Sequence, residues 1–291
     1  MTKPSAGTRL DERMSQSKRV FLSAEWRDLV MLNYEIEPGL LTRHVPPGTS
    51  LDSFNGRTYI SLVGFRFCRT KLFGCFPVPL HADFDEVNLR FYVRRKEGSD
   101  DRRGVVFIAE VVPRRAIAIT ARLLYGENYS CLPMKHRIGS EESTKTAEYQ
   151  WQVDDQWCTL SAQSTGAPQH PQAGSLEQFI TEHYWGYSTQ RSGRCLEYYV
   201  SHVPWQVWAT TAARFEGMPA IFMGANSGTF FSDAPTPHSC LMARLSSSSE
   251  AIESNEFARS RTGPPSLARV GYFTMAAADF VFTGFTSGKK W

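Results

Sequence analysis

The chain has 291 residues, of which 42% are hydrophobic and 21% charged, and this composition is ordinary for a soluble globular protein. The length allows one large domain or two small ones, with a sizeable core. The formal net charge is only +3, and basic residues form no long run, which argues against nucleic-acid binding as the main function. Aromatic residues make up 13% of the chain, and this enrichment favours β-strands.

Alternating polar and apolar residues predict a succession of strands interrupted by short helices. Strand–helix–strand alternation is absent, which argues against a doubly wound parallel sheet. We therefore predict a mainly β (α+β) fold, an antiparallel, closed or nearly closed β-barrel with a few short helices. Strands are expected at residues 29–36, 57–67, 86–93, 104–112, 147–153, 157–161, 196–203 and 206–210; helices at 38–45, at 116–124 and from Ser175, with Gln178 in a capping-box position; and loops at 73–81, 129–136 and 163–175.

Composition also sets the expected domain limits. Residues 1–20 are polar, carry both charges and lack an apolar run, so they are expected to be a disordered leader and not a secretory signal. Residues 21–245 are predicted to form a single domain. The tail, residues 246–291, begins with four serines and contains a Gly-Pro-Pro sequence, so it is expected to be poorly ordered and to add little stability.

The cysteines and the apolar stretches bear on location. None of the six cysteines forms a C-x-x-C pair or has zinc-finger spacing, so we expect reduced thiols, no metal site and a cytoplasmic protein. The apolar stretch at residues 270–285 is too short for a spanning helix and carries Asp279, so no membrane segment is predicted.

Several charged and aromatic residues are candidates for a binding site, and each also has a purely structural interpretation. Arg27 is either a solvated charge or a guanidinium that holds a carboxylate in a cavity. Glu86 belongs either to an exposed acidic turn or to a site. Lys135 is either a surface cation or a desolvated nucleophile. The run from residue 182 to residue 187 either lines a pocket for a flat or apolar ligand or packs a corner of the barrel, and its candidates are His183, Tyr184 and Trp185.

Six segments together resemble a known family. From about Phe21 to about Ala243 the chain is similar to the YqjF-like family, a bacterial group of unknown function, which looks like a branch of the acetoacetate decarboxylase-like superfamily. The segments that carry the resemblance are residues 24–29, 45–49, 59–65, 84–90, 112–118 and 181–187.

The resemblance implies an antiparallel β-barrel around a small-molecule pocket, and it implies roles for particular residues. Arg27 falls at the substrate-binding arginine of the decarboxylase and Glu86 at an active-site glutamate, while Ser61 replaces the other glutamate. Met134 stands where the decarboxylase has its Schiff-base lysine, followed by Lys135. Because methionine cannot form an imine, decarboxylation through a Schiff base is not expected.

Two functions remain open from the sequence. The first is a β-barrel that binds a small carboxylate or carbonyl compound, possibly as a lyase-like enzyme, with Arg27 as anion anchor and Glu86 and Lys135 as catalytic candidates. The second is a non-enzymatic binding or structural module of the same fold. Neither requires a cofactor, a nucleic acid or a membrane, and the sequence does not indicate an oligomeric state. The sequence contains no G-x-S-x-G elbow, phosphate-binding loop or dinucleotide fingerprint.

Overall fold

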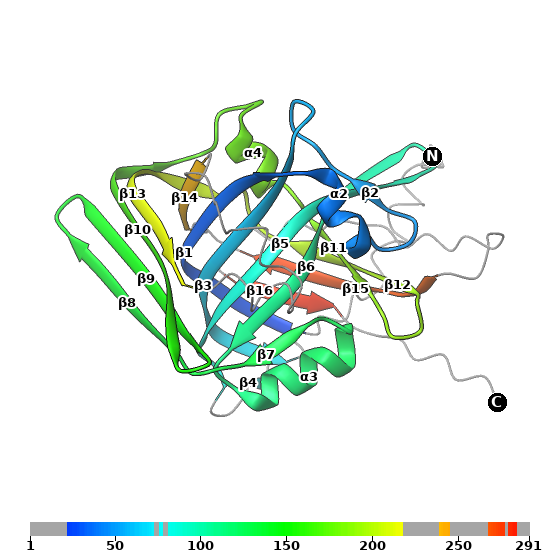
Figure 1. The fold of residues 1–291 in the computed structure, drawn as a ribbon, viewed down its shortest axis with the longest axis horizontal. Coiled ribbons are helices and arrows are strands. Elements are labelled where there is room, and N and C mark those ends of the chain that lie inside the picture. The colour runs from blue at the N-terminus through cyan, green and yellow to red at the C-terminus, as the bar shows by residue number, and fades with distance from the viewer. Residues whose placement is uncertain are drawn as a thin grey trace, which may run out of the picture.

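The protein is mainly β-structure, with a few short helices, as predicted (Figure 1). The computed structural model describes residues 22–72, 76–77, 81–217, 239–244, 267–276 and 279–283. Sixteen strands in this part of the chain belong to one hydrogen-bonded sheet. The expected leader lies outside the described residues.

The described part of the chain contains short helices and many strands. The helices are α2 (Pro38–Leu41), the 3-10 helix η1 (Thr42–His44), α3 (Arg115–Tyr125) and α4 (Leu176–Thr181). The strands are β1 (Leu22–Ile36), β2 (Ser50–Leu51), β3 (Thr58–Leu72), β4 (Phe76–Pro77), β5 (Phe84–Glu97), β6 (Asp100–Val112), β7 (Tyr129–Cys131), β8 (Met134–Glu141), β9 (Thr144–Val153), β10 (Gln156–Gln169), β11 (Trp185–Thr189), β12 (Cys195–Ser201), β13 (Gln206–Glu216), β14 (Ser239–Arg244), β15 (Leu267–Ala276) and β16 (Asp279–Thr283).

The strand order differs from a simple barrel. The sheet runs β16-β15-β12-β11-β6-β5-β3-β1-β14-β13-β10-β9-β8, with β2, β4 and β7 paired to β5, β3 and β6. No pair among the described strands joins β16 to β8, so closure of the predicted barrel is not confirmed. Most pairs are antiparallel, but β6 pairs in parallel with β7 and β11, and β12 with β15. The predicted antiparallel order fails at these pairs, because the chain crosses over before β7, β11 and β15.

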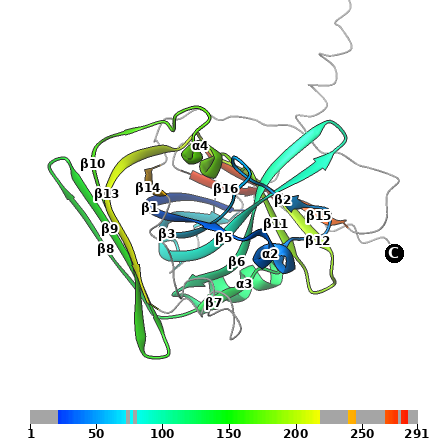
Figure 2. The same cartoon turned by 45° about the horizontal axis from the view of Figure 1, so that its top comes forward.

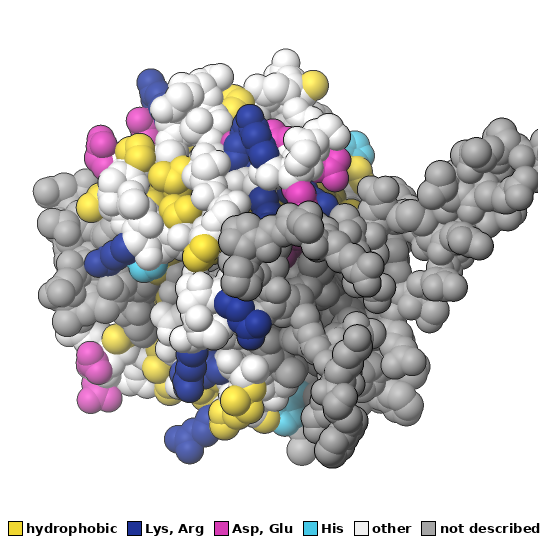
Figure 3. Space-filling view, turned by 90° about the vertical axis from the view of Figure 1, so that its right-hand side faces the viewer, with side chains coloured by type: hydrophobic (Ala, Val, Ile, Leu, Met, Phe, Trp, Pro, Cys, Tyr) yellow, Lys and Arg dark blue, Asp and Glu magenta, His cyan; other side chains and the backbone are white. Residues whose placement is uncertain are grey.

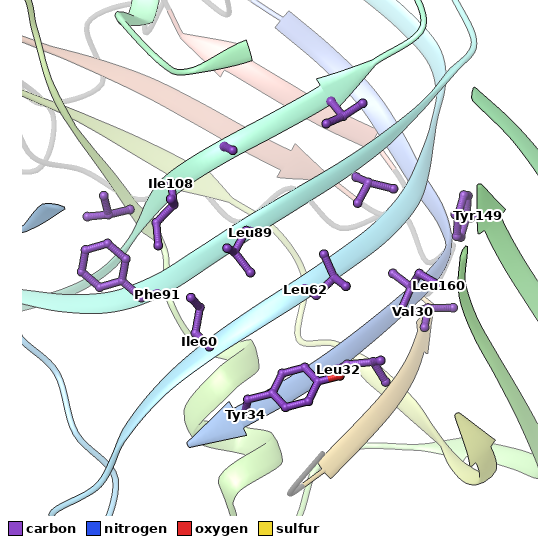
Figure 4. Close-up of a cluster of buried hydrophobic side chains, with 14 of the residues drawn as sticks. Val30, Leu32, Tyr34, Ile60, Leu62, Leu89, Phe91, Ile108, Tyr149 and Leu160 are labelled. Carbon is purple, nitrogen blue, oxygen red and sulfur yellow. The ribbon is translucent and has the colours of Figure 1, made fainter. Parts of the chain in front are cut away.

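The central strands are buried on both faces. In β5 the nine residues from Asp85 to Val93 are all buried, which requires packing layers above and below the strand. One face belongs to a core that the strands share with β9 and β10, where Tyr149 and Leu160 approach Leu62 and Val30 (Figure 4). This layer of β8, β9, β10 and β13 lies to one side of the central strands in both ribbon views (Figures 1 and 2). We call the face of the central strands that packs against this layer the apolar face.

The other face packs against the helices and the strands on the far side. Its core includes Phe65 from β3, Ala118 from α3, Phe179 from α4 and Tyr198 from β12. Helix α3 lies along β7, and α4 lies at the opposite end of the molecule (Figure 1). We call this side the polar face, because buried charged residues of β5 and β6 point toward it.

Local sequence explains most element limits. The Ser175 Oγ accepts a hydrogen bond from the Gln178 N–H at 3.2 Å, and the Gln178 side chain accepts one from the Gly174 N–H at 2.7 Å, so the predicted cap of α4 is present. The segment at 129–136 is not a loop: Pro133 separates β7 from β8. Residues 163–169, also expected to be a loop, continue β10 through its pairing with β13.

Charged side chains of both signs are present on the face shown in Figure 3. On that face Lys and Arg side chains lie among Asp, Glu and hydrophobic side chains. No helix in the described part of the chain is long and apolar enough to cross a membrane.

Candidate functional site

Strand β5 carries a stripe of buried polar side chains. Glu86, Asn88 and Arg90 are respectively 3%, 1% and 5% exposed. Successive side chains of a strand point to opposite faces, so these three share one face, while Val87, Leu89 and Phe91 pack on the other. The polar stripe therefore points into the polar face of the sheet.

A β-bulge in β6 directs a second glutamate to the same face. Leu89 pairs with Ala109 and Arg90 with Phe107, so Ile108 is an extra residue in the ladder. Before the bulge, Val105 and Phe107 pack on the polar face; after it, the even-numbered Val112 does so. The bulge thus turns Glu110 away from the apolar core and toward Glu86.

These side chains line a cavity of about 50 Å³. One water molecule needs roughly 10–15 Å³ by this measure, so the cavity has room for a few waters or a small organic molecule. Its wall is mostly aromatic and apolar, with charged and polar groups set into it. The lining residues are Trp26, Phe67, Glu86, Arg90, Val105, Phe107, Glu110, Glu127, Tyr129, Thr181, His183, Trp185, Tyr198, Val200, His202 and Trp205.

Three carboxyl groups of the cavity have raised pKa values. Burial raises the pKa of Glu86 to about 7, although Asn88 and Tyr129 donate hydrogen bonds to it at 3.0 and 3.1 Å and Arg90 adds a favourable charge. Burial and the Glu86 charge raise the pKa of Glu127 to about 8 against a 2.5 Å hydrogen bond from Tyr198. Burial and the neighbouring Glu127 and Glu86 raise the pKa of Glu110 well above its ordinary value. At neutral pH the cluster therefore holds protons that it can exchange.

Arg90 is a buried guanidinium that forms no ion pair with any residue the structure describes. Its Nη2 donates to the Met31 sulfur at 3.9 Å, a weak acceptor, and its Cζ lies 6.0 Å from the centre of the Tyr92 ring. Its Nε has no hydrogen-bond partner among the described residues. Isolated buried charges are costly, so an unpaired buried arginine is a strong indication of an anionic ligand.

Two histidines complete the wall. Burial lowers the pKa of both His183 and His202 to about 4, so both rings are neutral at pH 7. The His183 Nε2 lies 3.3 Å from the Asp52 carboxylate. The His202 ring accepts a hydrogen bond from Trp205 Nε1 at 3.0 Å and stacks on Tyr184 at 4.3 Å between ring centroids.

The structure brings some predicted residues together at this cavity. Glu86, His183 and Trp185 line it, while Tyr184 lies one step outside, against His202. Ser61 faces the same side of the sheet, but its hydroxyl is bonded to Asn33 at 2.6 Å and lies 2.5 Å from the Tyr92 hydroxyl, and it does not line the cavity.

Arg27 does not line the cavity that contains Glu86. Its side chain is 48% exposed and forms an ion pair with Glu25. The neighbouring Trp26 lines the cavity, and adjacent side chains of a strand point to opposite faces, so Arg27 must point away. The expectation that Arg27 and Glu86 share a cavity is therefore not met.

Met134 and Lys135 also lie elsewhere. Both belong to β8, at the far edge of the sheet, where Met134 packs against the apolar-face core. Lys135 is exposed, with its Nζ 4.1 Å from the centre of the Trp157 ring. The structure does not bring Lys135 together with Glu86.

The sequence reasoning did not name Arg90, Glu110, Glu127 and His202 as site residues, nor the lining residues Tyr129, Thr181 and Tyr198. The signal for Arg90 was available, since Glu86, Asn88 and Arg90 alternate along one strand. Such alternation is typical of a half-buried strand, whereas both faces of this strand are buried. No group of three or more possible metal ligands was found among the described residues.

Solved structures share this fold. Acetoacetate decarboxylase from Legionella pneumophila superposes with a TM-score of 0.51 over 84% of this chain and 95% of its own, at 13% identity. The enduracididine biosynthesis enzyme MppR in complex with pyruvate superposes with a TM-score of 0.50 over 79% of this chain and 87% of its own, at 13% identity. At such identities the likeness establishes the fold alone.

Sequence comparison places the chain in a family. It is 26% identical over 183 residues to the uncharacterized protein YqjF of Bacillus subtilis (strain 168), covering 62% of this chain and 72% of that protein. A family profile described as an uncharacterized conserved protein, DUF2071, matches residues 23–244. The chain therefore belongs to the DUF2071 family, and its fold is similar to that of acetoacetate decarboxylase.

Proposed function

We propose that the cavity binds a small carboxylate or carbonyl compound, with Arg90 as the anion anchor. The observation that carries the proposal is the unpaired, 5% exposed guanidinium in the cavity wall. A ligand carboxylate would supply the missing charge and accept the hydrogen bond from Nε. Burial raises the pKa values of the neighbouring carboxyls, to about 7 for Glu86 and about 8 for Glu127, so near pH 7 they carry less negative charge than ordinary carboxyls and repel that anion less.

Glu86 is suited to move a proton on such a ligand. A general acid or base works best when its pKa lies near the working pH, and burial raises the pKa of Glu86 to about 7. No lysine is among the described residues that line the cavity, so an imine is not part of the proposed chemistry. We propose that the Glu86 carboxylate takes a proton from the carbon next to a ligand carbonyl, which leaves an enolate, and that the protonated Glu86 then returns a proton to that carbon.

The structural neighbours are compatible with this ligand class. MppR has been solved with pyruvate bound, and one neighbour is an acetoacetate decarboxylase, so proteins of this fold accept small carboxylates and carbonyl compounds. The alternative is a non-enzymatic module that binds the same compounds without turnover.

Binding and turnover can be tested separately. Calorimetric titration with pyruvate, acetate and propionate should detect binding that Arg90→Met weakens by about 10- to 100-fold, the value of a lost charge-assisted hydrogen bond. Arg27→Met is the matched control, since it removes the same group from the exposed position, and it should leave the affinity unchanged. Absence of binding, or an equal loss in both variants, would contradict the proposal.

Turnover is tested by exchange of the pyruvate methyl protons in D₂O, followed by proton NMR. We expect protein-dependent exchange that Glu86→Gln abolishes while binding persists. Binding without exchange would favour the non-enzymatic alternative.

A further inference from the structure

Asp52 is a buried carboxylate in hydrogen-bond contact with the His183 ring. It follows β2, it is 1% exposed, and its backbone N–H donates to the Tyr92 carbonyl at 2.9 Å. Its carboxylate accepts hydrogen bonds from Arg94 Nε at 3.0 Å and from Arg103 Nε at 2.8 Å. Although burial opposes this, the hydrogen bonds from His183 and Arg103 hold the pKa of Asp52 below its ordinary value. Asp52 is therefore an ionised group that can only accept hydrogen bonds.

Asp52 fixes which ring nitrogen of His183 carries the proton. The Nε2 lies 3.3 Å from the Asp52 Oδ2, and a carboxylate has no hydrogen to give, so the hydrogen must lie on Nε2. The Arg103 Nη2 is also near, at 3.4 Å, and donates one of its two hydrogens to the Phe179 carbonyl at 3.3 Å. The shorter contact is the one with Asp52, which can only accept, and it assigns the hydrogen to Nε2. Since the charged neighbours Arg90 and Arg103 and the burial of the ring keep His183 neutral, Nδ1 keeps a free lone pair.

The lone pair of His183 Nδ1 accepts no hydrogen bond from any residue that the structure describes. Nδ1 is buried and has no hydrogen-bond partner among the described residues, and the side chain lines the cavity. The ring itself is held by Tyr92 and Phe179, with centroids 4.6 and 5.2 Å away. A buried acceptor without a partner is destabilising, so a donor on the ligand is the natural partner.

We propose that the ligand is a 2-hydroxy carboxylate, whose carboxylate binds Arg90 and whose hydroxyl donates to His183 Nδ1. This rests on the proposed function, because it takes Arg90 as the anion anchor. It concerns the binding preference alone: pyruvate remains a weaker ligand, with which the proton exchange of the proposed function is measured. A 2-oxo acid of the same size would instead set a carbonyl lone pair against the lone pair of Nδ1. Asp52 is a positioning residue in this scheme, since it acts on the ligand only through His183.

The first test measures ligand preference in the wild-type protein. Calorimetric titration with D-lactate, L-lactate, pyruvate and propionate should show one lactate enantiomer binding at least about tenfold more tightly than pyruvate and propionate, because only lactate satisfies Nδ1. Equal affinities, or a preference for pyruvate, would overturn the hydroxy-acid proposal while leaving binding at Arg90 intact. Loss of all binding would instead contradict the proposed function.

The second test reads the tautomer directly. The ¹⁵N NMR spectrum of His183 in the free protein should show protonated Nε2 and unprotonated Nδ1, and Nδ1 should shift when lactate binds. A proton on Nδ1 would overturn the proposal. This measurement does not depend on any variant folding.

Asp52→Asn offers a sharper contrast, because its amide can donate to Nε2 and so move the ring proton to Nδ1. The preference for lactate over pyruvate should then fall by about tenfold or reverse. Asp101→Asn is the matched control: Asp101 also pairs with Arg94, at 3.4 Å, but is 44% exposed. It should keep the wild-type preference, and an equal change in both variants would contradict the role of Asp52.

Discussion

The two faces of β5 share one backbone but differ in what they bury. On the apolar face, Val87, Leu89, Phe91 and Val93 belong to the same buried cluster as Tyr149 of β9 and Leu160 of β10. Figure 4 labels Leu89 and Phe91 of these strand residues. On the polar face the alternate positions hold Glu86, Asn88 and Arg90, which are equally buried. Apolar side chains would fill both faces at lower cost, since buried polar groups must recover their lost hydration. The apolar face therefore serves folding, whereas the polar face carries a cost in stability that the proposed ligand would offset.

The comparison predicts its largest contrast at two adjacent residues. Phe91→Ala removes a fully buried ring from the apolar face and should lower the free energy of unfolding by about 3–5 kcal/mol. Arg90→Met removes an unpaired buried charge and should leave stability unchanged or raise it by up to about 4 kcal/mol. Urea denaturation of both variants measures the contrast, and a large loss in Arg90→Met would mean that Arg90 supports the fold and not a ligand.

A smaller effect is expected from pH, and its sign follows from the carboxyl groups of the polar face. The pKa of Glu127 rises from 4.5 to about 8, and that of Glu86 to about 7, so the folded protein binds more protons than the unfolded chain between these limits. That stability is fully present below pH 4.5 and is lost as the pH rises through the folded values. The pKa values of His183 and His202 are lowered from 6.5 to about 4. These histidines therefore make the stability rise with pH, but only below about pH 6.5.

The informative window is therefore pH 6.5 to 8. Stability measured by denaturation should fall as the pH rises, by at most about 1.4 kcal/mol per pH unit for each carboxyl. Glu127→Gln should flatten this decline, whereas the exposed Glu37→Gln should not. A wild-type stability that rises across the window would contradict the raised pKa values and with them the view of the polar face as a proton store.

The difference between the faces also explains what the sequence could predict. Strand and helix positions follow from alternation and capping, and most expected elements are present, including α3, α4 and the β9–β10 hairpin. Alternation alone, however, cannot tell a solvated polar face from a buried one, so Arg90 was overlooked. Which face is covered depends on strands far away in the chain, here β11 and β12.

The bulge in β6 shows a second limit. Without it, Glu110 would share the apolar face with Ile108, and nothing local in the sequence marks Ile108 as the extra residue. The opposite error concerns Arg27, which was placed by resemblance. A shift of one residue along a strand exchanges its faces, so a match that is correct along the chain can still put the wrong side chain in the cavity.

Truncation before Ser246 is expected to have a still smaller effect. The family profile ends at residue 244, and β14, which joins β1 to β13, is retained. The tail contributes β15, paired with β12, and β16. We expect a change in melting temperature below about 2–4 °C, equivalent to less than about 1 kcal/mol for a domain of this size. A larger drop would show that β15 supports β12 and therefore the Tyr198 side of the polar face.

The smallest effect is expected at Lys135, which lies on the layer that covers the apolar face. Imine formation needs an unprotonated amine, and only about 0.1% or less of an ordinary lysine is unprotonated at neutral pH. Lys135 is exposed, with its Nζ 4.1 Å from the centre of the Trp157 ring, and the cavity is lined by other residues. Borohydride treatment with acetoacetate, followed by intact mass measurement, should give no adduct, and Lys135→Ala should bind carboxylates as the wild type does. An adduct that maps to Lys135 and disappears in Lys135→Ala would show that Schiff-base chemistry occurs on β8, away from the cavity. It would also contradict the proposal that the chemistry takes place on the polar face.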